Sequence, residues 1–426
     1  MRLSSRSLPA PRQKALRRRQ RAHSRWAVAG WTALGLADAA FTALLATGLA
    51  ARTLRPEVWA APQASALALP ATAALSLPLA GLWVALTLGS PRRRRSAVWW
   101  TGCVVHIGLA AVAGARLDVP RSAPTAPASD PVLTFLSLNG GGASEGSPAW
   151  LARLLASETP EVVAFQETAL LWLRTSAPGT PVERVLAAQP MAGPLLGGGY
   201  TAPEPDFVDA VENGERIGVE VPVFVRDSAG VELLAYERHA LGAPDDETAG
   251  EASRSEIVWR GRRIAIYNVH LRSFGEERPW RTGQMRSLAA WRLAMVSFDQ
   301  SLRLRAVEAE RFRALLEDEP LPFLVAGDLN STSDQWAYAH IADGLLDALS
   351  LRGTWWARAT YPSRRPLVRI DAVLASRHWI VDDAWVGPDG LSDHRPVLVR
   401  LRLREDPAPM EAVMLPTPDA PPPVLP

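Results

Sequence analysis

The sequence is short of cysteine and of lysine. Its single cysteine, Cys103, excludes an intramolecular disulfide framework and any metal site built from several thiolates. Its single lysine, Lys14, leaves arginine to carry almost all of the positive charge. Disorder over the whole chain is also excluded, because 48% of the 426 residues are hydrophobic and can bury a large core.

The first 117 residues contain almost no acid. They hold 16 basic residues and two acidic ones, Asp38 and Glu57, for a net charge of +14. Residues 118–426 carry 30 basic and 42 acidic residues, a net charge of −12, so the overall value of +2 is a cancellation. Such asymmetry is typical of a basic segment that meets a membrane or a polyanion.

Three apolar runs occupy the basic segment, at residues 26–51, 67–88 and 97–117. Each is long enough to cross a hydrocarbon core of about 30 Å as a helix. Asp38 opposes insertion of the first run by roughly 2.5 to 3.5 kcal/mol, which the apolar residues around it about balance. We therefore predict a multi-pass anchor of three transmembrane helices over residues 26–117, with the lipid bilayer as its partner.

The basic clusters predict the orientation of this anchor. Nine basic residues and no acid precede Trp26, and four arginines at 92–95 separate the second run from the third. Positive loops stay cytoplasmic, so residues 1–25 are expected in the cytoplasm and the chain after residue 117 outside it. A cleaved signal peptide and nucleic-acid binding by residues 17–19 are the alternatives. Asp38 and His106 are interpreted as helix-packing residues rather than as a relay.

Two proline-rich segments delimit an acidic domain. Residues 118–131 are predicted to be an extended linker, and residues 405–426, with eight prolines, a disordered tail. The domain between them, residues 132–404, has the pattern of an α/β fold. Buried strands are predicted at 132–138, 162–165, 257–270, 323–326, 370–375 and 397–403, and helices at 148–157 and 285–316.

Polar side chains gather at the ends of these predicted strands. Those able to bind a cation or to move a proton are Asn139, Glu167, His270, Asp328, Asn330, Asp371, Asp393 and His394. Because they come from separate strands, we expect them to converge at one edge of the sheet core. Carboxylates, amides and imidazoles in one place are typical of phosphoryl chemistry with a hard cation.

The motifs that carry these residues resemble the endonuclease/exonuclease/phosphatase superfamily. Gln166-Glu167, Asn268-Val269-His270, Gly327-Asp328-Leu329-Asn330 and Ser392-Asp393-His394 occur in the order found in that family. The resemblance extends from about residue 132 to residue 403. It implies a four-layer α/β/β/α sandwich and a Mg²⁺-dependent hydrolase of phosphate esters, with Mn²⁺ as the alternative metal.

The resemblance also implies a role for each residue. Glu167 would be the principal metal ligand, with Asn139 and Asp393 close to the metal. The remaining implied roles are His394 as general base oriented by Asp371, Asp328 and Asn330 as ligands of the attacking water or the phosphoryl oxygens, and His270 as a hydrogen-bond partner of the transition state. The structural alternatives are turn caps for the asparagines and a hydrogen-bonded core position for His270.

One feature departs from the family pattern, and a second is an arginine-rich stretch outside the motifs. Asn139 is followed by three glycines instead of an apolar continuation of the strand, which leaves the local backbone open. Arg272 begins an arginine-rich stretch that we interpret either as a phosphate-binding rim or as a solvated helix face.

We expect a membrane-anchored, extracytoplasmic phosphodiesterase or phosphatase that attacks a phosphate ester with water. A lipid head group or a small phosphate ester is favoured as the substrate over nucleic acid, because the net charge of −12 opposes binding to a polyanion. The alternative within the same chemistry is a nuclease, and the alternative from another class is a catalytically silent binding module.

Overall fold

A computed structural model shows the arrangement of most of the chain. It describes residues 36–89, 91–94, 97–115, 131–141, 147–167, 170–173, 193–203, 216–219, 221–243, 246, 248–275, 278–279, 282–352, 357–390 and 392–404. The chain divides into two compact units, residues 1–50 with 64–116 and residues 51–63 with 117–426. Residues 51–63 lie in the middle of the predicted anchor by sequence, but they belong to the second unit.

Within the described ranges, the first unit contains the apolar helices Leu36–Ala50, α3 (Leu69–Leu88) and α5 (Ala97–Ala115) and the short basic helix α4 (Pro91–Arg94). The helix α2 (Ala61–Leu67) begins in the second unit and ends in the first. Among the described residues, Ala71–Leu88 is the one helical stretch both long and apolar enough to cross a membrane; Leu36–Ala50 and Ala97–Val112 are apolar but shorter. Residues 26–35 and 116–117 of the predicted spans lie outside the described residues, as do 118–130 of the linker and the tail. Three spans therefore stay a prediction.

Asp38 and His106 meet inside the first unit. The imidazole Nε2 of His106 lies 3.0 Å from Asp38 Oδ1, and its Nδ1 donates to the carbonyl of Gly102 at 2.8 Å. His106 is buried, and the ring of Trp83 stacks on it with centroids 5.1 Å apart. The pair joins helix Leu36–Ala50 to α5, which gives the acidic side chain of the first apolar run a polar partner.

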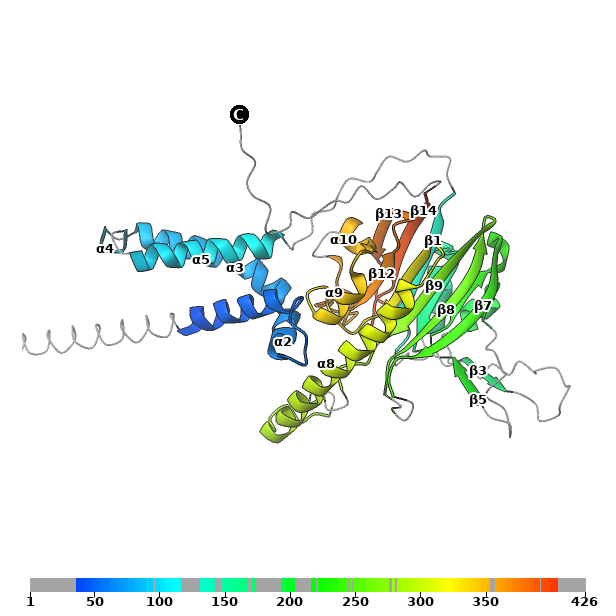
Figure 1. Cartoon of the computed structure of the whole chain (residues 1–426), viewed down its shortest axis with the longest axis horizontal. Helices are drawn as coiled ribbons and strands as arrows, with labels where there is room; N and C mark the ends of the chain where they lie inside the picture. Colours follow the sequence, from blue (N-terminus) through cyan, green and yellow to red (C-terminus); the bar gives the residue numbers. More distant parts are fainter. Residues whose placement is uncertain are drawn as a thin grey trace, which may run out of the picture. The chain divides into compact units, whose positions relative to one another are not determined.

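Two six-stranded sheets form the core of the second unit (Figure 1). The first sheet has the order β13 (Trp379–Val386), β14 (Val397–Leu403), β1 (Leu133–Asn139), β2 (Val162–Gln166), β6 (Val223–Arg226) and β4 (Tyr200–Thr201). β1 and β2 are parallel, and the other neighbours are antiparallel. The central strands β1 and β2 are buried along almost their whole length, as their apolar runs predict.

The second sheet repeats this plan. Its order is β11 (Leu346–Asp347), β12 (Asp371–Ala375), β10 (Phe323–Asp328), β9 (Arg262–His270), β8 (Glu251–Trp259) and β7 (Val231–Ala240). β9 and β10 form its parallel pair. A separate ribbon pairs β3 (Leu170–Leu173) with β5 (Arg216–Val219), and a short 3₁₀ turn covers Asp227–Ala229.

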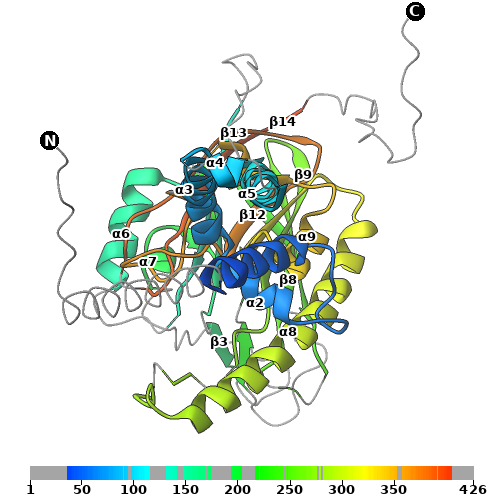
Figure 2. The same cartoon turned by 90° about the vertical axis from the view of Figure 1, so that its left-hand side faces the viewer.

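Helices cover the outer face of each sheet, and a further apolar core lies between the sheets. The inner core packs residues such as Phe135, Ile266 and Leu324 from both sheets. α6 (Ser147–Glu158) and α7 (Gly193–Gly197) cover the first sheet, while α8 (Leu288–Glu317) and α9 (Trp336–Ala342) cover the second (Figure 2). α10 (Ala348–Arg352) contributes Ala348 and Leu349 to the inner core. This arrangement confirms the predicted α/β sandwich.

One predicted strand is wrong in its extent. Residues 257–270 do not form a single strand but parts of β8 and β9, joined by a tight turn at Arg260 and Gly261. Both turn residues have positive φ, 53° and 75°, as a type I′ hairpin turn requires. The apolar residues on both sides of the turn hid the reversal, because both strands contribute to the same core.

Candidate active site

The ends of two parallel strand pairs bring the predicted residues together. In the first sheet Asn139 ends β1 beside Gln166 at the end of β2, and Glu167 follows directly. In the second sheet His270 ends β9 beside Asp328 at the end of β10, and Asp371 opposite Asp328 begins β12. Parallel neighbours end at the same edge of a sheet, so the topology places side chains of distant sequence segments at one edge.

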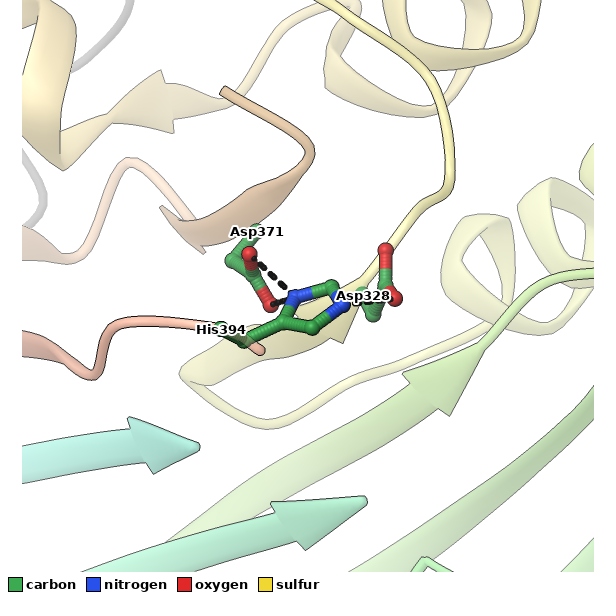
Figure 3. A group of neighbouring side chains, drawn as sticks. All are labelled: Asp328, Asp371 and His394. Atoms are coloured by element: carbon green, nitrogen blue, oxygen red, sulfur yellow. Dashed lines mark hydrogen bonds and ion pairs between the residues drawn. The ribbon is translucent and has the colours of Figure 1, made fainter. Parts of the chain in front are cut away.

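A buried histidine and two buried carboxylates form the centre of this site (Figure 3). His394 Nδ1 donates to Asp371, at 2.9 Å from Oδ2 and 3.1 Å from Oδ1. Its Nε2 lies 3.6 Å from Asp328 Oδ2. The bond to Asp371 fixes the ring, so that Nε2 is directed toward Asp328.

The charges in this group alter each other's protonation. Burial disfavours the imidazolium, but the carboxylates of Asp371 and Asp328 outweigh burial and raise the pKa of His394 to about 10. Burial raises the pKa of Asp328 above its usual range, the charge of His394 opposes that rise, and the charge of Asp371 adds to it. Negative charge in this group therefore favours any cation beside it, whether a proton or a metal ion.

Asn139 links the two sheets at the site. Its Nδ2 donates to Glu167 Oε1 at 3.1 Å and to Asp328 Oδ2 at 3.0 Å. Its Oδ1 accepts the N–H of Gly141 at 2.9 Å. His270 Nε2 lies 3.5 Å from Glu167 Oε1 and 3.9 Å from Asp328 Oδ2, and it has no hydrogen-bond partner among the described residues. A buried nitrogen of this kind is suited to a ligand oxygen.

Three oxygen atoms come together beside Gly141. A Cβ on Gly141 would lie 2.7 Å from Glu167 Oε2, 3.0 Å from Asp393 Oδ1 and 3.1 Å from Asn139 Oδ1. The three side chains that the family resemblance places at the metal thus lie close together on one side of this glycine. Oxygen ligands including carboxylates suit Mg²⁺ or Mn²⁺, and we call this group the oxygen cradle.

A second group in the same site could also hold a divalent ion. Asp328, Asp371 and His394 offer ligand atoms within 4.8 Å of one another, and all three are buried. However, His394 Nδ1 is already hydrogen-bonded to Asp371, so that nitrogen is not free to bind a metal ion in this arrangement. The oxygen cradle, which has no imidazole, fits a hard cation better.

Backbone strain marks three of the site positions. Glu167 and Asn330 have positive φ angles of 54° and 45°, which non-glycine residues seldom adopt. Gly327 has φ 141°, and any Cβ there would collide with the carbonyl of Val269 on the parallel strand. The glycine before Asp328 is therefore required for β10 to lie against β9 at the site.

Asn330 uses its polar atoms to shape the loop after β10. Its N–H donates to Asp328 Oδ1 at 2.7 Å, and its Nδ2 donates to the carbonyl of Leu271 at 2.8 Å. The second bond ties the loop after β10 to the loop after β9. Asn330 lies at the site as predicted, and its amide contact with the backbone adds a positioning role.

Arg272 is turned into the protein. It is 8% exposed, and its guanidinium contacts Glu308, Asp246 and Thr248. The guanidinium N–H groups of Arg272 already donate to these side chains. Its phosphate-binding role therefore stays a prediction. Of the arginines that follow it, Arg281 lies outside the described residues.

Arg305 supports the site from α8, and the sequence analysis did not single it out. It is fully buried, and it donates to the carbonyls of Arg272 at 2.7 Å, Ser273 at 3.1 Å and Asn330. Burial lowers the pKa of Arg305 to about 10, so it remains a cation at neutral pH. The signal was its spacing: Leu302, Arg305, Ala309 and Phe312 share the buried face of α8 at helical intervals.

Other buried polar residues position the site residues. Gln166 Nε2 donates to Asn268 Oδ1 at 2.6 Å, and Asn268 donates in turn to the carbonyls of Phe165 and Pro222. Ser392 donates to the carbonyl of Asn139 at 2.7 Å and accepts the N–H of His394 at 3.0 Å. The contacts of Gln166 and Asn268 join the two sheets beside the site, and Ser392 ties the His394 segment to the end of β1.

Comparison with known proteins agrees with this geometry. The chain matches the model of the Endonuclease/Exonuclease/phosphatase family over residues 136–394, more than half of its length. No protein in a set of curated sequences matches it.

Several solved structures resemble the chain at low identity. An endonuclease/exonuclease/phosphatase protein of Bacteroides vulgatus has 17% identity and a TM-score of 0.43 over 64% of this chain and 100% of its own. D. rerio TDP2 complexed with a single strand DNA product has 16% identity and a TM-score of 0.41, over 64% of this chain and 100% of its own. A mannosyl-6-phosphatase of Bacteroides thetaiotaomicron has 16% identity and a TM-score of 0.39, over 63% of this chain and 99% of its own. On the family match, the chain belongs to the endonuclease/exonuclease/phosphatase family, whose members are phosphoric ester hydrolases.

Proposed function

We propose that this protein is a membrane-anchored, extracytoplasmic phosphodiesterase or phosphatase that requires a divalent metal ion. The observation that carries the proposal is the convergence of a buried His394–Asp371 pair with Asp328, His270 and the oxygen cradle. Each part has a separate task in water attack on phosphorus. A buried acid cluster of this kind would be costly as a purely structural feature.

The oxygen cradle is the proposed place of the metal. Glu167, Asn139 and Asp393 would hold Mg²⁺, or Mn²⁺ as the alternative, with room left for a phosphate oxygen. A divalent cation held there would neutralise charge on the phosphoryl oxygen and, by opposing the imidazolium charge, would favour the neutral ring of His394.

His394 is proposed as the general base. The ring must be neutral to accept a proton from water, and Asp371 then stabilises the imidazolium that forms at Nδ1. Nε2 is directed toward Asp328, so the attacking water would lie between these two groups. Asp371 does not need to accept the proton itself, because its charge stabilises the protonated ring.

The remaining residues act on the phosphoryl group. His270 Nε2 lacks a hydrogen-bond partner among the described residues and is proposed to donate to an oxygen on which charge builds in the transition state. Asp328 and Asn330 hold the water or the phosphoryl oxygens. Arg305 and Asn330 together fix the loops after β9 and β10, which holds His270 and Asp328 in position relative to each other.

Contacts within the second unit support the proposed orientation of the anchor. Residues 51–63 connect the first two predicted spans, and they dock on α8 and α9: Arg55 pairs with Glu310 at 2.7 Å, and Gln63 accepts the N–H of Trp336 at 2.9 Å. A loop that packs on the catalytic fold must lie on the same side of the membrane. The basic clusters independently predict that side to be outside the cytoplasm.

Hydrolysis assays test the proposed function. The full-length protein in detergent or nanodiscs should release the aryl group from an aryl phosphodiester or monoester with Mg²⁺ and not with a chelator. Glu167→Ala should abolish the metal dependence together with the activity. Metal-independent turnover would contradict the mechanism, and no turnover with any phosphate ester would favour a binding module.

The same assay ranks the substrates. We propose a phospholipid head group over nucleic acid, because the segment 118–426 is acidic and a bilayer anchor concentrates the enzyme near lipid. Faster hydrolysis of plasmid DNA than of phospholipid in nanodiscs would reverse this preference and identify a nuclease.

A further inference from the structure

The N-terminal half of α8 extends beyond the sheets (Figure 1). Exposed apolar side chains cluster there and in the turn just before it. The cluster, which we call the α8 patch, consists of Met285 in that turn and of Leu288, Leu293, Met295 and Val296 on the helix, with exposed fractions of 54 to 81%. The other large apolar residues exposed in the described part of 131–404 lie singly, at Val132, Leu234, Val307 and Leu367. Scattered residues of this kind are ordinary, but a cluster on one helix indicates an interaction surface.

This part of α8 is an ordered helix and not a frayed end. Ser287 caps it by accepting the N–H of Ala290 at 3.2 Å. Its inner side packs through Ala290 and Ala294, which are buried, and Phe298 stacks on Phe274 with ring centroids 3.9 Å apart. The inner side therefore faces protein, and the patch residues on the other side have the solvent as their neighbour.

The charge around the patch fits an anionic lipid surface. Residues 278–298 contain four arginines, at 278, 281, 286 and 292, and no acid, although Glu276, Glu277 and Asp299 border them. Asp299 is paired with Arg303 at 2.9 Å. Arg292 lies one turn from Leu288 and from Met295, so a cation stands among the apolar side chains. Arginine beside leucine, methionine and tryptophan is the composition of interfacial helices that enter the head-group region.

The connection to the anchor identifies the same face of α8. Arg303 donates to the carbonyl of Glu57 at 2.9 Å, and Glu310 pairs with Arg55, so the loop of residues 51–63 docks along this helix. Steps of three or four residues lead from Leu288 through Met295 and Asp299 to Arg303, which places all of them on one side of α8. In the docked loop, Val58 and Trp59 are 76% and 50% exposed.

We infer that the α8 patch, together with Val58 and Trp59, is a membrane-contact surface that enters the head-group layer of an anionic bilayer. The anchor loop holds α8 near the membrane at Arg303, and Leu288 lies about 22 Å further along the helix axis. Two separated contacts hold the catalytic domain in a fixed orientation to the bilayer. The inference rests on the anchoring part of the proposed function but not on its chemistry.

A fluorescence experiment tests the contact. The full-length protein carries Cys103→Ala, so that Leu288→Cys or Met295→Cys provides the single thiol for an environment-sensitive dye. It is reconstituted in nanodiscs of phosphatidylcholine mixed with phosphatidylglycerol. We expect a blue shift of the dye at either position and quenching by a nitroxide on the lipid chain, and neither at the matched control Leu234→Cys on β7.

Each outcome decides a separate point. A dye at 288 and at 295 that is as accessible to a water-soluble quencher as the dye at 234 overturns the inference. Crosslinking of the 288 thiols into dimers within the nanodisc also overturns it, because a second copy would then cover the patch. The measurement is repeated with His394→Ala, so that a failure of catalysis does not affect it, and release of the protein by alkaline extraction would report failure of the anchor instead.

Discussion

Two hydrogen-bonded histidine–aspartate pairs of nearly equal length lie among the described residues, one in each unit. In the apolar helices His106 Nε2 lies 3.0 Å from Asp38, and in the sandwich His394 Nδ1 lies 2.9 Å from Asp371. Around the first pair are Thr42, a backbone carbonyl and the ring of Trp83. Around the second are Asp328 and, through Asn139, the acid of Glu167.

The comparison indicates that the residues around a histidine–aspartate pair determine its role. Asp38 and His106 satisfy each other and join two helices, which suffices as an interhelical link. Asp371 and His394 lie beside further negative charge, and that charge favours a proton or a metal ion. The predictions below break one pair at a time and compare the results.

The largest effect should come from His394→Ala. Loss of a general base reduces kcat by about 10²- to 10⁴-fold, while binding of the phosphate ester changes less. The measurement is steady-state hydrolysis of an aryl phosphate ester by the full-length protein. The matched control is His106→Ala, which removes the other paired imidazole and should leave kcat close to wild type; equal losses in both variants would contradict the assignment.

Glu167→Gln should weaken Mg²⁺ or Mn²⁺ binding by more than about 100-fold, because it removes a negatively charged ligand from the oxygen cradle. Loss of a residue that only supports a metal ligand typically costs roughly 10- to 100-fold in affinity. Calorimetric titration of the full-length protein measures this loss without reference to activity. Glu161→Gln is the control: Glu161 is a buried carboxylate away from the cradle, and it accepts the N–H of Thr134 at 3.0 Å. Unchanged affinity in Glu167→Gln would remove the cradle as the metal site.

Gly141→Ala should also reduce metal affinity, by placing a methyl group 2.7 Å from Glu167 Oε2 and within 3.1 Å of the other two cradle oxygens. The control is Gly140→Ala, whose Cβ would meet the ring of Phe165 at 3.0 Å and should lower stability with less effect on affinity. The same titration and a thermal unfolding curve separate the two effects. Wild-type affinity in Gly141→Ala would contradict the proposed position of the ion.

Asp38→Ala and His106→Ala should each destabilise the apolar helices, with a coupling energy of about 0.6 to 2 kcal/mol in the double-mutant cycle. Denaturation of the full-length protein in mixed micelles provides the free energies. Additive effects of the two substitutions would show that the pair contributes no interaction energy. Hydrolysis by both variants serves as the comparison with the second pair.

The smallest effect on hydrolysis should come from Asp347→Asn, because Asp347 is not one of the site residues, whereas its cost in stability should be largest near neutral pH. Burial raises the pKa of Asp347, but Arg369, Tyr338 and Ser350 outweigh it and hold the pKa well below the usual 3.8. The folded state therefore favours the carboxylate, so its stabilisation is present above pH 3.8 and is lost as the pH falls below that value. Unfolding free energies measured across acidic pH should fall less steeply in the variant.

Much of the site was predictable, because its residues lie beside apolar strands in a fixed order. Asn139, Glu167, His270 and Asp328 stand at or next to the ends of two parallel strand pairs, as expected of parallel strands that end together. Asp371 joins them from the start of the antiparallel strand β12, and His394 joins them through its hydrogen bond to Asp371. The hairpin at Arg260 was missed, since two apolar strands with a short turn resemble one longer strand. Arg305 was missed because a charged residue on the buried face of α8 is recognised only when helical spacing is compared with the core.

The contacts of residues 51–63 and the exposed apolar face of α8 were not predicted from the sequence. Hydropathy assigns the loop to the anchor, but its polar atoms find their partners on α8 and α9. The arginine-rich helix was read as either a phosphate rim or a solvated face, whereas burial separates an inner network at Arg272 and Arg305 from an outer apolar patch. Both outcomes depend on which side of a helix meets other segments.

The sequence by itself determined the α/β class, the residue types of the site and the charge separation between +14 and −12, because these depend on local periodicity and composition. Only the tertiary structure decided which groups share charge. Pairing of β10 with β12 placed Asp328 near Asp371 and His394, three oxygens came together beside Gly141, which has no side chain, and the packing of α8 left one face exposed. Contacts between residues far apart in the chain depend on pairing and burial, which no local pattern specifies.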